Sequence, residues 1–175
     1  IDEAIKDYCS IANEHHFNRL KNALNDAVSN GAEIACGGEI SQSGLYFSPA
    51  VLTGVKYDNP IMHEEIFGPI LPIVKVQNLE ESISYINDNE KPLALYLFSN
   101  KSSVHNKVLK TTSSGGMVIN DCVLHHMNPN LPFGGINNSG VGSYHGKFGF
   151  DACSHHKAVL KSSSCLLYTS PSPRD

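Results

Sequence analysis

The stretch HEEIFGPILPI, residues 63–73, joins a charged turn to an apolar run of the kind found in strands. Two adjacent acids and one aromatic residue precede the bend at Gly68-Pro69. A carboxylate can accept two hydrogen bonds at once, for instance from the vicinal hydroxyls of a ribose, and a phenyl ring offers a flat apolar face. The stretch indicates a binding site at the start of a strand. The alternative is a solvated acidic turn with Phe67 packed in the core.

From residue 70 onward, strand-like and helix-like segments alternate along the chain. This order predicts strands over residues 70–76, 93–98 and 116–119. The second of them is a continuous apolar run of the kind buried on both faces. Between them it predicts one helix capped by Asn78 and ended by Lys91-Pro92, and another opened by Asn100. Pro72 makes the first half of its strand edge-like. Tandem strand-helix-strand units favour right-handed crossovers and a parallel sheet, so the predicted fold class is α/β.

Apolar residues at helical spacing predict which side chains face inward. In the second of these helices they are Val104, Val108 and Leu109. An earlier helix is expected between a cap at Asn13 and a stop at Asn30-Gly31, with inward residues Phe17, Leu20, Leu24 and Val28. Short extended segments are expected over residues 32–36 and 46–51, the latter interrupted by Pro49.

The character of the chain changes after Asp121. Residues 122–142 contain many Pro and Gly and predict a long ordered loop, a feature that is usually functional or part of an interface. A short helix is expected within residues 141–149 and a terminal strand over 150–160. The Ser- and Pro-rich residues 162–175 show no periodicity and are expected to be a disordered or artefactual tail.

Two motifs resemble the aldehyde dehydrogenase family: EEIFGPILPI, residues 64–73, and SSGGMVINDCVLHHMNPNLPFGGINNSGVGSYHGKFGFDACSHHKAVL, residues 113–160. The Asn-Asp after a strand, LPFGG and GSYHGK are similar to the class-three and fatty aldehyde dehydrogenase branch. The resemblance extends from Asp7 to Lys161. Because members of this family are well over twice as long, the chain is expected to be a C-terminal fragment.

This resemblance implies oxidation of an aldehyde to a carboxylic acid by NAD or NADP through a cysteine thioester. Carried over residue by residue, it makes Glu65 the carboxylate that holds the nicotinamide ribose and Phe67 the aromatic residue beside the nicotinamide ring. Leu131, Phe133 and Gly134 become a wall of the substrate entrance, and the alternative for their loop is a packed turn-rich segment. The family's nucleophile and general base lie upstream, so no catalytic residue is assigned in this chain.

The family also implies an architecture and a substrate class. Residues 1–149 correspond to part of the catalytic domain, with the N-terminal cofactor-binding domain missing. Residues 150–161 correspond to an oligomerisation strand, which implies a homodimer for the complete enzyme. The branch implies medium- or long-chain aliphatic or aromatic aldehydes. Two alternatives stay open: a non-catalytic truncated product that acts as an oligomerisation module, and a coniferyl-type branch of the family.

Composition bears on partners and location. The formal net charge is −4, and the 13 basic residues form no dense cluster, which disfavours nucleic acid as a partner. No apolar run approaches the roughly 20 residues of a membrane-spanning helix, although anchoring through a missing tail stays open. The five scattered cysteines fit reduced thiols and a cytoplasmic location. Cys122 is expected to be a half-buried apolar residue. Six of the nine histidines lie in three adjacent pairs, and because neighbouring side chains point to different faces of a helix or strand, they predict no metal site.

Overall fold

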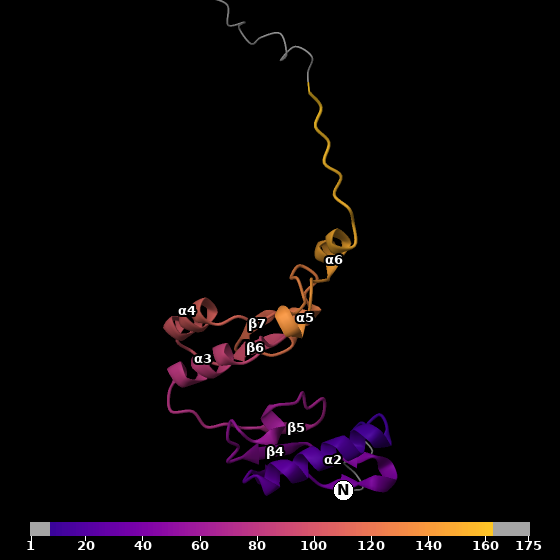
Figure 1. Ribbon diagram of the computed structural model, residues 1–175, viewed down its shortest axis with the longest axis vertical. Coiled ribbons are helices and arrows are strands. Elements are labelled where there is room, and N and C mark those ends of the chain that lie inside the picture. Colours follow the sequence, from indigo (N-terminus) through magenta and orange to yellow (C-terminus); the bar gives the residue numbers. More distant parts are fainter. Residues whose placement is uncertain (1–7, 163–175) are drawn as a thin grey trace, which may run out of the picture. The chain divides into compact units, whose positions relative to one another are not determined.

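Within residues 8–162, which the computed structural model describes, the first element is helix α2 (Glu14–Ser29) (Figure 1). The Asn13 side chain caps it, since Oδ1 accepts a hydrogen bond of 2.9 Å from the main-chain N–H of His16. Three of the predicted inward residues are buried, but Val28 is 42% exposed. Ala27 is buried instead, because it lies seven residues after Leu20 and continues that side of the apolar stripe.

Helix α2 packs on a small mixed sheet to form the core of the first of two compact units, which divide between Gln77 and Asn78. The strands of this sheet, in spatial order, are β1 (Glu33–Cys36), β4 (Ala50–Thr53) and β5 (Ile70–Pro72). Strand β4 is antiparallel to β1 and parallel to β5. A separate pair, β2 (Ile40–Ser41) and β3 (Tyr46–Phe47), flanks the turn η1 (Gln42–Gly44). Phe17 and Leu20 of the helix and Leu52 of β4 are fully buried.

The partner of β5 differs from the sequence-based prediction. The strand was expected to join the sheet of the two later strands, but it pairs with β4, and it ends at Pro72 rather than Val76. Its place at the edge of the sheet agrees with the expectation from Pro72, which has no N–H to donate. The next ladder bond comes from the main-chain N–H of Ile73, which donates to the carbonyl of Leu52 at 2.8 Å.

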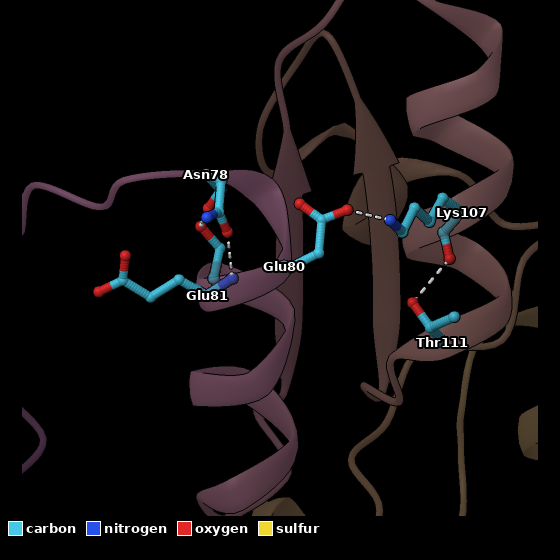
Figure 2. Close-up of polar contacts among 6 residues, drawn as sticks. Asn78, Glu80, Glu81, Lys107 and Thr111 are labelled. Atoms are coloured by element: carbon cyan, nitrogen blue, oxygen red, sulfur yellow. Dashed lines mark hydrogen bonds and ion pairs between the residues drawn. The ribbon is translucent and has the colours of Figure 1, made fainter.

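The second unit contains the predicted parallel strand pair. Its elements are α3 (Leu79–Asp88), β6 (Ala94–Leu97), α4 (Ser102–Thr111) and β7 (Gly116–Ile119), with β6 parallel to β7 in the register Ala94↔Gly116 to Leu97↔Ile119. Figure 2 shows the predicted cap, in which Asn78 Oδ1 accepts from the Glu81 N–H at 2.9 Å. It also shows Glu80 of α3 paired with Lys107 of α4. The α/β fold class is confirmed.

Burial in this second unit is lower than the apolar pattern predicts. Leu93 and Phe98, which flank β6, are 41% and 66% exposed, so the run over residues 93–98 is not buried on both faces. Among the described strands β6 pairs with β7 alone, so it is an edge strand of a two-stranded sheet and its flanking residues stay open along that edge. In α4, Val108 is buried but Leu109 is 61% exposed. The helix begins at Ser102 with Lys101 at the cap position, so Asn100 is not its cap.

In the described part of the chain, three short elements follow β7: α5 (Leu124–Met127), η3 (Asn137–Ser139) and α6 (Gly146–Ala152). The expected short helix within residues 141–149 is α6, displaced toward the C-terminus. Residues 150–152 are therefore helical and not part of a strand, and an ion pair of 2.5 Å between Lys147 and Asp151, one turn apart, supports the helix there. Residues 155–162 have no regular secondary structure, and Val159 and Leu160 are 79% and 95% exposed. The rest of the expected tail lies outside the described residues.

Candidate functional site

The residues expected to hold the cofactor lie on the Glu65 loop, residues 63–68, between η2 (Pro60–Met62) and β5. Both ends of this loop are fixed. At one end Asn59 caps η2, with Oδ1 accepting from the Ile61 N–H at 3.2 Å. At the other end the carbonyl of Pro69 accepts from the Ala50 N–H at 2.8 Å, where β5 joins β4. The loop therefore starts and ends on the core of the first unit.

The Glu65 loop presents a carboxylate and an aromatic ring to solvent. Glu65 is exposed, and its carboxylate has no hydrogen bond or ion pair with any other residue in the range 8–162. Phe67 is 77% exposed, which contradicts its packing in the core. Its backbone has φ of +41°, in the left-handed region that is uncommon for residues other than glycine. Both side chains are thus open to a ligand.

A pocket of about 380 Å³ lies between α2, η2 and the Glu65 loop. Its walls include Glu64 and Glu65 of the loop, Arg19 and Asp26 of the helix, and the apolar side chain of Ile61. Phe67 is not among its lining residues. The pocket combines carboxylates, a guanidinium and an apolar patch, a mixture that suits a polar ligand with an apolar part.

Arg19 was not singled out by the sequence. Its guanidinium reaches from α2 to the loop, where Nη2 donates to the carbonyl of Ile66 at 2.6 Å and Nη1 to the carbonyl of Glu65 at 3.4 Å. The only sequence signal is its place next to Leu20, at the border of the buried stripe of the helix.

The residues expected at the substrate entrance lie in the second unit, on residues 131–134. Leu131 is 44% exposed, whereas the Phe133 ring is half-buried. Phe133 exchanges two main-chain hydrogen bonds with Tyr144, of 3.0 and 2.9 Å. Gly134 lies so close to Gly142 that a Cβ would stand 2.1 Å from its carbonyl oxygen, which explains the glycine. The loop is closely packed, and the Leu131 side chain is more exposed than that of Phe133.

Phe133 belongs to a cluster of rings, the Phe133 cluster, made by His125, His126, Phe133, Tyr144 and His145. His125 is 9% exposed, and neither ring nitrogen has a hydrogen-bond partner in the described chain. Its ring lies against Gly116 of β7, where a Cβ would stand 2.6 Å from Cδ2. Across residues 8–162 no three His, Cys, Asp or Glu side chains gather as a metal site would require.

Cys122 follows strand β7 of the parallel pair β6 and β7. It is exposed, not half-buried as expected. Its main-chain N–H donates to the Asp121 carboxylate at 2.7 Å, which holds the backbone and not the thiol. Neighbouring Asn120 has φ of +60°, and its Oδ1 accepts from the Ser99 N–H at 2.8 Å, so the two strand ends are tied together.

The sequence model of the aldehyde dehydrogenase family matches residues 2–159. The chain belongs to the aldehyde dehydrogenase family. Among curated relatives, it is 48% identical over 158 residues to aldehyde dehydrogenase family 3 member A2 of Rattus norvegicus. This match covers 90% of this chain and 32% of that protein. It is 47% identical over 155 residues to the rat aldehyde dehydrogenase described as dimeric and NADP-preferring, with coverage of 89% and 33%. The predicted resemblance to the class-three branch is confirmed.

A solved structure of this family agrees with the fold of the chain. The substrate-bound AldH of Staphylococcus aureus superposes with a TM-score of 0.84 at 45% identity, over 90% of this chain and 34% of that one. The chain thus spans about a third of the length of the aldehyde dehydrogenases that it matches. No helix within residues 8–162 is both long and apolar enough to cross a membrane.

Proposed function

We propose that the chain is the C-terminal part of a class-three NAD(P)-dependent aldehyde dehydrogenase subunit. In this subunit Glu65 and Phe67 hold the nicotinamide end of the cofactor. One observation carries the proposal: the Glu65 loop presents a carboxylate without a partner among residues 8–162 and an exposed ring two residues away, in a chain that matches the family over residues 2–159. The substrates proposed are medium- or long-chain aliphatic or aromatic aldehydes, which are oxidised to carboxylic acids.

The residues of the Glu65 loop fit the cofactor chemically. The two oxygens of the Glu65 carboxylate can accept hydrogen bonds from both hydroxyls of a ribose, because no described residue occupies them. The Phe67 ring, 77% exposed, can lie against a flat heterocycle. When bound, NAD or NADP supplies the acceptor for the hydride, and the loop orients the ring that receives it. The nucleophilic cysteine lies in the part of the subunit outside this chain.

The second unit supports two further parts of the proposal. Leu131, Phe133 and Gly134 form a wall of the substrate entrance, with the Leu131 side chain toward solvent and the Phe133 cluster behind it. Residues 150–161 contact a second subunit in a homodimer. The exposed apolar side chains of Val159 and Leu160 support such a contact, and one rat relative is described as dimeric.

The test compares the 175-residue chain with the complete subunit that carries it. Both are incubated with NAD, NADP and a panel of aliphatic and aromatic aldehydes, and NAD(P)H formation is followed by absorbance. The complete subunit should oxidise the aldehydes, and the chain alone should give no more NAD(P)H than a heat-killed sample. Turnover by the chain alone would overturn the placement of the nucleophile, and a complete subunit that reduces neither cofactor would overturn the proposed activity.

A further inference from the structure

The Glu65 loop is attached to α2 at two points. The first is polar: the Arg19 guanidinium donates to the carbonyls of Glu65 and Ile66. The second is apolar: Gly68 lies against the fully buried Leu20, so close that a Cβ on Gly68 would stand 2.3 Å from Leu20 Cδ2. Arg19 and Leu20 are neighbours in the helix, so both attachments come from one turn of α2.

Phe67 lies between these two attachments, and its backbone is strained. A residue with a Cβ at φ of +41° persists when the surrounding structure holds it there. The Phe67 ring does not provide that hold, because it is 77% exposed. The left-handed backbone is therefore imposed from its two sides, by the carbonyls bound to Arg19 before it and by the close packing of Gly68 after it.

We propose that Arg19 is a positioning residue for the Glu65 loop: it fixes the backbone that presents Glu65 and Phe67, without itself contacting the reacting atoms. The inference rests on the proposed cofactor role of those two residues. Arg19 forms no ion pair with a carboxylate in the described range, although Glu64, Glu65 and Asp26 line the same pocket. Because its guanidinium binds main-chain carbonyls, the Glu65 carboxylate stays free for a ligand.

The planar fork of an arginine suits this role better than a lysine. Two N–H groups separated by a fixed distance reach two successive carbonyls, and hydrogen bonds from a charged donor are stronger than neutral ones. The ammonium of a lysine is a single point from which the same two carbonyls are reached less well. Arg19→Lys should therefore retain part of the function, and Arg19→Met, which keeps an apolar stem but has no donor, should retain less.

The experiment uses the complete subunit and measures two quantities: the Kd for NAD and NADP, and the single-turnover rate of cofactor reduction at saturating cofactor. We expect Arg19→Met to slow the hydride step by roughly tenfold or more, because a small displacement of reacting groups is costly. Arg19→Lys should fall between Arg19→Met and the wild type. Lys21→Met, a loss of charge two residues along the same helix, is the matched control and should leave the rate unchanged.

A double variant separates positioning from a general loss of structure. If Arg19 acts through the loop, Arg19→Met combined with Glu65→Gln should slow the hydride step little more than the more damaging single change. Independent, multiplied effects would overturn the proposal, as would a wild-type rate in a folded Arg19→Met subunit. If the Arg19→Met subunit does not fold, Arg19→Lys takes its place: Arg19→Lys combined with Glu65→Gln should likewise slow the hydride step little more than the more damaging single change.

The two proposals fail differently in this experiment. A slow Glu65→Gln subunit beside a fast Arg19→Met subunit would overturn the positioning role alone. Wild-type rates in both Glu65→Gln and Arg19→Met would overturn the cofactor role of Glu65, and with it the role of Arg19. A slow Arg19→Met subunit beside a fast Glu65→Gln subunit would remove Glu65 from the cofactor site and overturn the inference that Arg19 acts by presenting it.

Discussion

The side-chain amide of Asn59 donates a hydrogen bond of 3.1 Å to the main-chain carbonyl of Ala27, close to the end of helix α2. Asn59 is 2% exposed, and its other amide atom, Oδ1, accepts from the Ile61 N–H at 3.2 Å. One buried side chain thus joins the end of α2 to the start of η2. Because η2 leads into the Glu65 loop, this bond helps to place the candidate cofactor residues.

Asn59→Ala should lower the free energy of unfolding of the chain by about 1–3 kcal/mol, the usual cost of removing a buried hydrogen-bonding partner. The Ala27 carbonyl keeps its bond of 3.0 Å from the Ala32 N–H, but the Ile61 N–H loses its acceptor in a buried place. Denaturant unfolding measures the change. Asn25→Ala, on the exposed side of α2, is the control and should be neutral or slightly stabilising, since alanine favours helices. Equal effects of the two changes would contradict the role of Asn59.

Gly68→Ala should destabilise the chain by about 1–3 kcal/mol, because the added methyl group would overlap the fully buried side chain of Leu20. Gly44→Ala is a matched change with the opposite expected sign. Gly44 is part of η1 and has open space where a Cβ would stand, so the loss of chain entropy in the unfolded state should stabilise by about 0.4–1 kcal/mol. Denaturant unfolding of both variants tests the pair. A Gly68→Ala chain as stable as the wild type would contradict the close packing of Gly68 against Leu20.

The close packing of Gly68 also shows where the sequence was informative and where it was not. The Gly-Pro pair indicated a bend, and the structure has one, but Gly68 is not in the left-handed region, which Phe67 occupies. The glycine is needed for close approach to Leu20. A contact between residues 48 positions apart leaves no mark on the local pattern, and the same holds for the reach of Arg19 to Ile66.

Local patterns did identify most elements. The spacing of Phe17, Leu20 and Leu24 located α2, and short apolar runs located β6 and β7. The pattern did not give the partner of β5. An apolar run indicates a strand and says nothing about which strand lies beside it, and β5 reaches β4 through residues 54–69, a crossover without an α-helix. Exposure at Phe98 and Leu109 was missed because the pattern reports apolar character and not the elements that cover it.

The pKa of Glu80 offers a prediction about the two helices of the second unit. The Lys107 ammonium, hydrogen-bonded to the carboxylate, lowers this pKa from the ordinary 4.5, and the Glu80 main-chain N–H and the charge of Lys107 add to the effect. Lys107→Met should therefore raise the pKa of Glu80 toward 4.5, as followed by NMR titration of the carboxyl group. Lys110→Met, in the last turn of the same helix, should leave it unchanged.

The sign of the linked stability effect follows from this lowered pKa. A carboxylate whose folded pKa lies below its unfolded value contributes stability above the unfolded value, and the contribution is lost as pH falls through the folded pKa. The difference in stability between wild type and Lys107→Met should therefore be present at neutral pH and shrink in acid below about pH 4.5. A difference that grows in acid would contradict the pairing of Glu80 with Lys107.

The two acids of the Glu65 loop can be separated by substitution in the complete subunit. Glu65→Gln keeps the shape of the side chain but removes its charge, and hydrogen bonds to a charged group contribute roughly 1.5–3 kcal/mol. The nicotinamide end of the cofactor would be held less firmly, so the hydride step should slow by roughly tenfold or more, at about 1.4 kcal/mol per factor of ten. Stability should change by less than about 0.5 kcal/mol, because the side chain is exposed and has no partner among the described residues.

Glu64→Gln, which changes the neighbouring acid on the wall of the same pocket, should slow the hydride step much less than Glu65→Gln does. Single-turnover reduction of NAD and NADP compares the two variants: a slower Glu64→Gln would transfer the role to Glu64, and wild-type rates in both would leave Glu65 a solvated residue of the turn.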